Sequence, residues 1–170
     1  RWQGRCCTDG QAASARASYW LGAGDSIRAR QTVWLGLGTA LALAAVLAAL
    51  LVGLAPAVAG LYVSEPLVLA ATVALLPWVA AYHLGDAVQA VALFLLRTYR
   101  ITLAPLLVYG VLLWGLGLSG GYWLAYHGLG PWPATQHPSA FWMTSAVALG
   151  LVAVVLTGLL AWAVQRSKTL

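Results

Sequence analysis

The sequence predicts an all-α, polytopic membrane protein with four transmembrane helices. Of its 170 residues, 62% are hydrophobic and only 8% are charged, and the mean hydropathy is +0.84, whereas an average soluble domain is about 25% charged. The apolar residues form four runs, and each run has the roughly 20 residues that a helix needs to cross a hydrocarbon core about 30 Å thick. These runs are residues 31–54, 67–96, 101–126 and 140–164.

The basic residues divide the chain into a membrane portion, residues 31–164, and two ends. Every Lys and Arg lies in one of three segments, residues 1–30, 97–100 and 165–170, and the other two connections have none. Because basic loops stay on the cytoplasmic side, both termini and the tail at residues 165–170 are predicted to be cytoplasmic. Topology thus explains the formal net charge of +5, and no nucleic-acid partner is expected.

Residues 1–30 are predicted to be a cytoplasmic segment that contains the end of a truncated helix. The chain starts with a polar stretch that lacks the apolar region of a signal peptide. Cys6 and Cys7 are adjacent rather than spaced as metal ligands, and cytoplasmic thiols stay reduced, so we expect neither a disulfide nor a metal site. The glycines in residues 22–25 predict a turn with a left-handed residue that ends this helix.

The first and last spans consist mainly of Leu, Ala, Val and Gly, and their predicted role is packing. Small residues let helix backbones approach each other closely inside a membrane. Four glycines are candidates for such contacts: Gly36, Gly38, Gly150 and Gly158.

The second span differs because it carries a carboxylate near its middle. Asp86 lies roughly 16 Å from Arg97 at the helix end, about half the depth of the hydrocarbon core. Tyr82, His83 and Gln89 lie within four residues of it, and we expect all four side chains to share one helix face. Since a charge in hydrocarbon is costly, Asp86 is predicted to be functional, with a purely structural hydrogen-bonding role as the alternative.

These four residues predict a site for ion-coupled transport. Asp86 and Tyr82 are the candidate site for a coupling cation, either Na⁺ or H⁺, and no cofactor is expected. Gln89 and His83 are candidates for lining a substrate cavity, although a lone histidine more often satisfies a neighbour's hydrogen bond. One carboxylate can exchange a proton for Na⁺ or for a cationic substrate, which is the chemistry of an antiporter.

A bend is predicted in the same span. Pro77 removes a backbone hydrogen-bond donor, and Gly85 loosens the helix beside the carboxylate. The backbone carbonyls that lose their partners must then face protein or water rather than lipid. A bent helix with a carboxylate at the membrane midplane is typical of a transport pathway.

Two other classes of protein are weighed. Residues 117–120, GLSG, match the GxSG pattern of rhomboid intramembrane serine proteases, but a nucleophilic Ser119 needs a base, and the last histidine, His137, lies in a loop. We therefore predict that the protein is not an enzyme. A small four-helix exporter or assembly subunit is the other alternative, but small multidrug resistance proteins carry their essential acid in the first span.

Four segments resemble transporters of the multidrug and toxic compound extrusion (MATE) family, of the NorM-like kind. Residues 14–30, SARASYWLGAGDSIRAR, are similar to the family's S-x-R-V-G-x-x-L-G-A-G-D-x-x-x-A-R at the cytoplasmic end of the eighth helix. Residues 61–70, LYVSEPLVLA, resemble the start of the tenth helix. Residues 82–97, YHLGDAVQAVALFLLR, are similar to Y-Q-x-x-D-x-x-Q followed by L-R, and residues 114–122, WGLGLSGGY, to W-x-x-G-L-P-x-G-Y.

The resemblance covers about residues 14–164 and implies that the four spans are helices nine to twelve of a twelve-helix antiporter in the bacterial inner membrane. Asp86 would be the cation-site aspartate of the C-terminal lobe, and Tyr82 the tyrosine one turn before it. Such proteins export cationic, often aromatic drugs in exchange for Na⁺ or H⁺. The implied partners are cationic drugs, the lipid bilayer and the missing N-terminal lobe, without which this C-terminal fragment is not expected to transport.

Several positions depart from the family's pattern. His83 replaces a glutamine, which leaves the coupling ion open. Thr98 and Ile101 replace Gly and Asp after the second span, which predicts a differently shaped turn. Ser119 replaces a proline, which predicts a changed kink in the third span, and residues 1–13 lack the apolar character of an eighth helix.

Overall fold

The computed structural model describes residues 9–128, 133, 134 and 136–166, and within them it contains only helices and their connections. Four helical segments in this part of the chain are long and apolar enough to cross a membrane: 26–53, 66–98, 103–126 and 139–166. The predicted all-α class and the four spans are therefore confirmed. In chain order the elements are α1 (Asp9–Gly22), α2 (Ser26–Gly53), α3 (Ala55–Gly60), α4 (Pro66–Thr98), α5 (Leu103–Gly110), the π-helix η1 (Val111–Ser119), α6 (Gly120–Tyr126) and α7 (Ser139–Arg166).

The turn between α1 and α2 forms where the glycines predict it. Gly24 has φ +78°, in the left-handed region that favours glycine. Asp25 follows as the N-cap of α2, and its Oδ1 accepts a hydrogen bond from the Arg28 backbone N–H at 2.9 Å. This cap starts α2 at Ser26, earlier than the predicted residue 31, because it satisfies a backbone donor of the first turn.

The connection after the first span contains the short helix α3. Pro56 stands in the first turn of this short helix, where its missing N–H costs nothing. Ala55 and Ala59 are buried there, and α3 contacts both α2 and α4. The short apolar helix therefore closes one end of the bundle.

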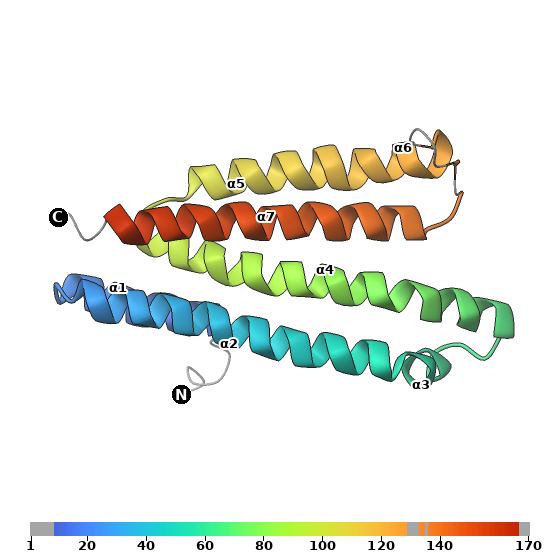
Figure 1. Cartoon of the computed structure of the whole chain (residues 1–170), viewed down its shortest axis with the longest axis horizontal. Helices are drawn as coiled ribbons and strands as arrows, with labels where there is room; N and C mark the ends of the chain where they lie inside the picture. Colours follow the sequence, from blue (N-terminus) through green and yellow to red (C-terminus); the bar gives the residue numbers. More distant parts are fainter. Residues whose placement is uncertain (1–8, 129–132, 135, 167–170) are drawn as a thin grey trace, which may run out of the picture.

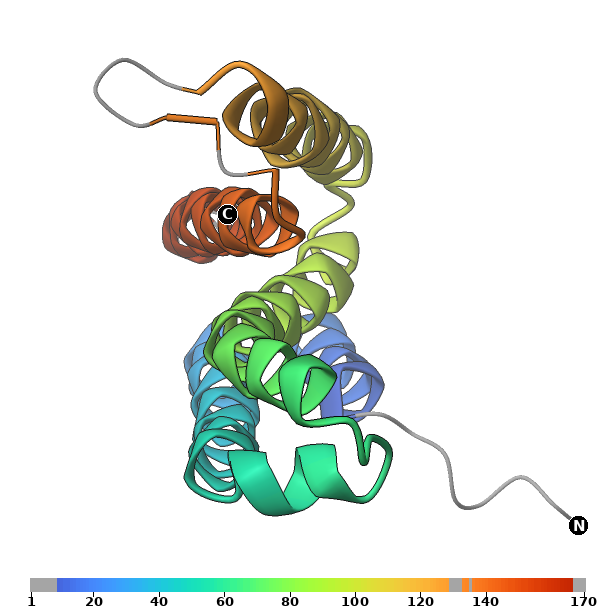
Figure 2. The same ribbon diagram turned by 90° about the vertical axis from the view of Figure 1, so that its right-hand side faces the viewer.

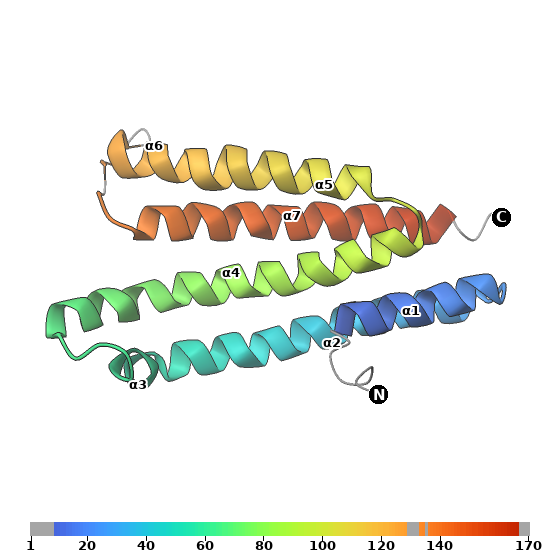
Figure 3. The same cartoon turned by 180° about the vertical axis from the view of Figure 1, so that it is seen from behind.

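α4 is the central helix of the bundle. α7 packs on one side of it and α1 and α2 on the other, while α5, η1 and α6 lie along the far side of α7 (Figure 2). The start of α2 and the ends of α4 and α7 lie at one end of the bundle, and α3 and α6 lie at the opposite end (Figure 1). Seen from behind, α1 runs beside the first half of α2 (Figure 3).

The main core lies between α4 and α7, which make the most extensive contact in the described chain. Large aliphatic side chains from both helices are fully buried in one cluster, among them Leu95, Leu96, Leu149, Leu156 and Leu160. A methyl group at Gly85 would lie 3.2 Å from both the Gly150 N and the Leu149 C. Gly85 therefore permits close approach to α7, which is a packing role rather than the predicted loosening of α4.

α4 continues as one helix from Pro66 to Thr98, so Pro77 does not end it. The third span is the irregular one, because its middle, η1, is a π-helix. Thr144 of α7 donates its hydroxyl to the Gly117 carbonyl at 2.8 Å, and Ser119 donates its own to the Trp114 carbonyl at 3.0 Å. These side chains supply hydrogen bonds to backbone carbonyls of a segment that departs from the regular α-helical ladder.

The glycine contacts only partly match the prediction. A methyl group at Gly36 would lie 2.7 Å from the Ala13 Cβ, so Gly36 permits the close approach of α1 and α2. Nothing lies within 4 Å of the corresponding position at Gly38 or Gly158, so the predicted close contact is not found there. Gly150 does lie at a close helix approach, but through its backbone N, which faces Gly85. The effective contact glycines include Gly85 and, on α6, Gly121.

The turn after α4 takes an unusual backbone conformation. Arg100 has φ 60°, which is rare for a residue with a side chain. Thr98 donates its hydroxyl to the Ser14 carbonyl and accepts from the Ser18 hydroxyl, both at 3.4 Å, so it links α4 to α1. Cys6 and Cys7, and the basic residues Arg1, Arg5 and Lys168 that support the predicted topology, lie outside the described residues.

Candidate functional site

The candidate carboxylate lies in the middle of α4 and is held by a side chain of the next turn. Gln89 donates from Nε2 to Asp86 Oδ1 at 3.1 Å. Gln89 is only 8% exposed, whereas Asp86 is half-buried. Packing therefore fixes the amide, and the amide orients a carboxylate that is itself still accessible.

Tyr82 stands one turn before the carboxylate and is held from two other helices. Its ring meets Trp142 of α7 edge to face, with the ring centroids 5.9 Å apart and the planes at 85°. This is a favourable geometry for two aromatic rings. Tyr109 of α5 and Tyr82 pack against the same buried cluster.

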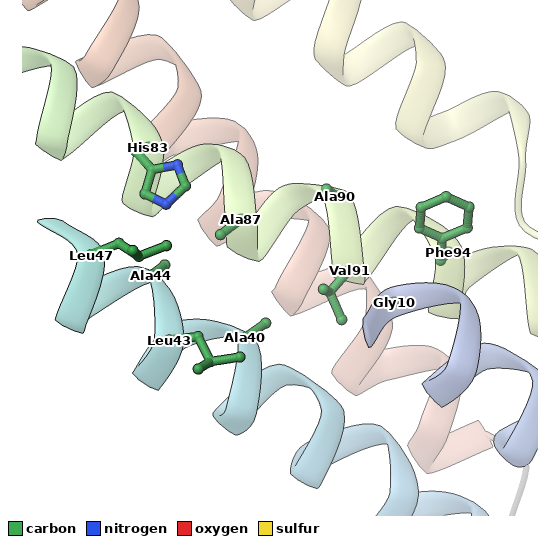
Figure 4. A pocket seen from close by; sticks show the side chains of 10 residues that line it. All are labelled: Gly10, Ala40, Leu43, Ala44, Leu47, His83, Ala87, Ala90, Val91 and Phe94. Atoms are coloured by element: carbon green, nitrogen blue, oxygen red, sulfur yellow. The ribbon is translucent and has the colours of Figure 1, made fainter. Parts of the chain in front are cut away.

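His83 lies apart from these side chains. Its ring lines a groove between α2 and α4, beside Ala87 and opposite Leu47 (Figure 4). Because successive residues of an α-helix are rotated by about 100°, His83 falls on a different face from Tyr82, while residues four and seven positions after Tyr82 return to its face. Gln89 and Asp86 therefore lie together as expected, whereas His83, three residues before Asp86, lines the groove toward α2.

The groove beside His83 has a volume of about 340 Å³ and is almost entirely apolar. Gly10 of α1 closes one end of it, and His83 is its only ionisable side chain. The remaining lining residues are Ala40, Leu43, Ala44, Leu47, Ala87, Ala90, Val91 and Phe94. Gln89 is absent from this lining, so the two residues predicted to line a substrate cavity face different surroundings, and their substrate roles stay predictions.

The side chains near Asp86 on α4 carry oxygen atoms of the kind that bind hard cations, and the carboxylate can also take a proton. Asp86 is the only carboxylate in the four described membrane spans. A carboxylate with a phenol and an amide nearby offers oxygen donors, which suit hard cations. Within the described residues no three His, Cys, Asp or Glu side chains come together as a metal site.

The geometry around Ser119 does not support a protease. Its hydroxyl donates to the Trp114 carbonyl, and in the described part of the chain no histidine contacts it. His137 pairs through Nδ1 with the Ser139 hydroxyl at 3.0 Å, and the ring of His127 stacks on Trp123. Ser119 therefore has no base to activate it.

Trp142 and Tyr109 are the residues that sequence reasoning missed at the candidate site. Neither residue is among the four that the sequence predicts for this site. Neither has a sequence signal of its own, because both reach Tyr82 from helices distant in sequence. A tyrosine at depth in a span, as Tyr109 is, was the one clue available.

Comparison with known proteins places the chain among membrane transporters. Residues 9–123 match the MatE family model. The chain is 38% identical over 162 residues to a protein named "Probable multidrug resistance protein NorM" from Aromatoleum aromaticum, a match that covers 94% of this chain and 32% of that protein. It is 39% identical over 161 residues to "Multidrug resistance protein NorM" from Burkholderia vietnamiensis, with 90% and 32% covered. The chain thus spans about a third of the length of the curated relatives that it matches.

Proposed function

Because this chain belongs to the MatE family of membrane transporters and is not an enzyme, we propose that it carries the cation-binding site of a multidrug efflux antiporter. The observation that supports this most is the single carboxylate of the described spans, held by Gln89 and adjacent to Tyr82. An acidic side chain inside a membrane span is rare and is usually functional. The buried amide that bonds to it and the tyrosine one turn away are what we expect of an acid that takes part in ion transport.

In the proposed mechanism Asp86 binds Na⁺ or H⁺, and Tyr82 contributes its hydroxyl to the same site. Gln89 keeps the carboxylate in one orientation, since its buried amide has few other positions. Occupancy by the coupling cation and by a cationic drug compete, so that each favours release of the other. His83, on the α2 side, is not part of this cation site.

We also propose a location in the bacterial inner membrane with both termini in the cytoplasm. Five exposed arginines of the described chain lie at or near ends of helices that meet at one end of the bundle: Arg28 and Arg30 on α2, Arg97 on α4, Arg100 just after it, and Arg166 on α7 (Figure 1). A sixth, Arg16, lies on α1, which runs beside the first half of α2 (Figure 3). Basic residues of this kind mark the cytoplasmic side. The remaining two thirds of a relative's length would supply the partner lobe of the transporter.

The proposal is tested first by cation binding to the purified chain in detergent. Na⁺ titrations at several pH values, followed by calorimetry and by thermal unfolding, are expected to show binding that protons compete with. Asp86→Asn removes the charge with little change in volume and is expected to weaken Na⁺ binding at least about tenfold. Undiminished cation binding by Asp86→Asn would contradict the proposed role.

Export is tested in a chimera in which this chain replaces the matching 162-residue stretch of the A. aromaticum relative. Membrane vesicles with the chimera are expected to export a cationic aromatic dye when an ion gradient is imposed. Asp86→Asn in the chimera is expected to abolish export while leaving membrane insertion intact, as checked by protease protection of a tagged C-terminus.

The rival classes fit less well. The MatE match and the unactivated Ser119 argue against an intramembrane protease, and a serine-directed phosphonate is expected to leave Ser119 unmodified. The MatE match also separates the chain from small four-helix exporters.

A further inference from the structure

Three arginines at one end of the bundle are stacked on aromatic rings. The Arg97 guanidinium carbon lies 5.3 Å from the centroid of Phe94, that of Arg166 lies 4.4 Å from Trp162, and that of Arg28 lies 4.7 Å from Trp20. All three stacked arginines are exposed. They lie near the end of α4, the end of α7 and the start of α2, which meet at the same end of the bundle (Figure 1).

From these contacts we propose that the Arg97–Phe94 pair binds the phosphate group of an anionic phospholipid in the leaflet at this end of the bundle, with Arg166 contributing positive charge nearby. This inference is independent of the proposed transport function. It concerns residues outside the α4 carboxylate site, and it assigns them a partner of stated chemistry.

Stacking on an aromatic ring favours phosphate binding by a guanidinium group. The ring attracts one face of the planar group, which limits its rotamers, while its N–H edge remains directed sideways and can donate two parallel hydrogen bonds to a phosphate. Arg97 forms no hydrogen bond or ion pair with another described residue that would compete for this edge. An ordered, charged fork at the membrane surface is thus a better phosphate ligand than a flexible one.

The position of the rings points to lipid rather than to a soluble anion. Trp162 is 47% exposed on a transmembrane helix, so it lies where acyl chains and headgroups meet. Arg97 and Arg166 each stand in the last turn of their helix. The described carboxylates at this end are few, and one of them, Asp25, already pairs with Arg28 at 3.2 Å. Charge complementarity therefore favours an anionic membrane surface.

Arg28 offers an internal contrast. It is stacked like the other two arginines, but its Nε faces Asp25 Oδ2 within the same turn region. Part of its hydrogen-bonding edge and its charge is already satisfied, so we expect Arg28 to contribute less to phospholipid binding than Arg97.

The test uses the purified chain in detergent, titrated with phosphatidylglycerol or with phosphatidylcholine of the same acyl chains, and native mass spectrometry counts bound lipids. We expect about fivefold tighter binding of phosphatidylglycerol, and weaker binding at high salt. Arg97→Lys keeps the charge but loses the planar fork, and we expect it to lower this preference about threefold at its site. Arg100→Lys is the matched control, because Arg100 is exposed at the same end without a ring partner, and it should change little.

Three outcomes would overturn the inference. Equal binding of both lipids would show that the headgroup is not recognised. Unchanged phosphatidylglycerol binding in Arg97→Lys would show that bulk charge alone attracts lipid. Displacement of the lipid by equimolar inorganic phosphate would show a site for free phosphate. Circular dichroism on each variant checks that the helices persist, and Arg→Lys changes leave Phe94 and its contact with Gly10 untouched.

Discussion

α4 and the third span both pack against α7, but they do so in different ways. α4 is a regular helix although it contains Pro77, whereas the third span becomes a π-helix between α5 and α6 without a proline in that stretch. Both approach α7 through a glycine, Gly85 on α4 and Gly121 on α6. The comparison teaches that irregularity follows hydrogen bonds offered by the neighbouring helix, here from Thr144, more than the presence of proline.

The largest expected effect comes from placing a larger side chain at the close contact between α4 and α7. Gly85→Val would place side-chain atoms against the backbone of Leu149 and Gly150, which cannot move aside as a side chain does. We expect a loss of about 3 kcal/mol in the free energy of unfolding, at the upper end for overpacking. Denaturant titration in mixed micelles followed by circular dichroism measures it.

Gly150→Ala is the control for this variant, because nothing lies within 4 Å of the position its methyl group would take. It changes a glycine on the other side of the same helix crossing and is expected to be neutral or slightly stabilising. Equal stability of Gly85→Val and Gly150→Ala would refute the account of the α4–α7 contact.

The third span is tested in the same manner. A methyl group at Gly121 would lie 2.7 Å from a ring carbon of Phe141 and 2.8 Å from the Thr144 Oγ1. The two nearest contacts are side chains that can partly give way, whereas the Phe141 Cα at 3.1 Å is backbone. We therefore expect Gly121→Ala, which adds one methyl group, to cost about 2 kcal/mol. Gly120→Ala is the neighbouring control, since its nearest atom, on Thr144, is 3.9 Å away. The same denaturation assay compares the free energies of unfolding of the two variants. An unchanged stability in Gly121→Ala would mean that α6 does not pack tightly against α7.

A third variant removes the hydrogen bond between Thr144 of α7 and Gly117 of the third span. Thr144→Val keeps the shape of the side chain but loses the hydroxyl that donates to the Gly117 carbonyl, and we expect a loss of about 1 kcal/mol. Hydrogen exchange should accelerate in η1 and not in α4. Thr39→Val is the matched control, because its hydroxyl bonds only to carbonyls of its own helix; an equal effect of both would remove the special role of Thr144.

The smallest expected effect is on Na⁺ affinity. It distinguishes Trp142, the α7 residue that contacts Tyr82, from Thr144, the α7 residue that bonds to the third span. Trp142→Leu removes the ring that meets Tyr82, and we expect Na⁺ affinity to fall about threefold, in line with the value of an aromatic pair. Thr144→Val should leave Na⁺ affinity unchanged. Calorimetric Na⁺ titration measures both, with Trp114→Phe as the control on the third span, and loss of affinity in Thr144→Val alone would reverse the assignment.

Much of the fold could be predicted from the sequence, because a membrane-spanning helix requires a long run of apolar residues that composition reveals directly. Length and apolarity identify four spans, and a glycine before Asp25 identifies the turn at Gly24. The π-helix could not be predicted, because the Thr144 hydroxyl that bonds to Gly117 comes from a helix 27 residues later. Likewise, the role of Gly85 depends on which backbone it meets, and the sequence of α4 alone does not carry that information.

The candidate site was predictable only in part. Helical periodicity places Tyr82, Asp86 and Gln89 on one face, and the hydrogen bond between the last two agrees with it. Periodicity alone does not separate His83, which precedes Asp86 by three residues just as Gln89 follows it by three; only the groove toward α2, which His83 lines, shows its different surroundings. Trp142 and Tyr109 join the site through tertiary packing, which no spacing along α4 reveals.

The position of the α4–α7 core has a consequence for how the protein is made. Its two halves are separated in the sequence by the entire third span, so Leu95 and Leu96 cannot meet Leu156 and Leu160 until the last helix has left the ribosome and entered the bilayer. Until then the face of α4 that packs on α7 lacks that helix, although the cluster residues of α1 and α2 and the bond from Gln89 to Asp86 are already available. Nascent chains arrested before residue 139 are therefore expected to be short-lived in the cell, because membrane proteases recognise helices that lack their partner.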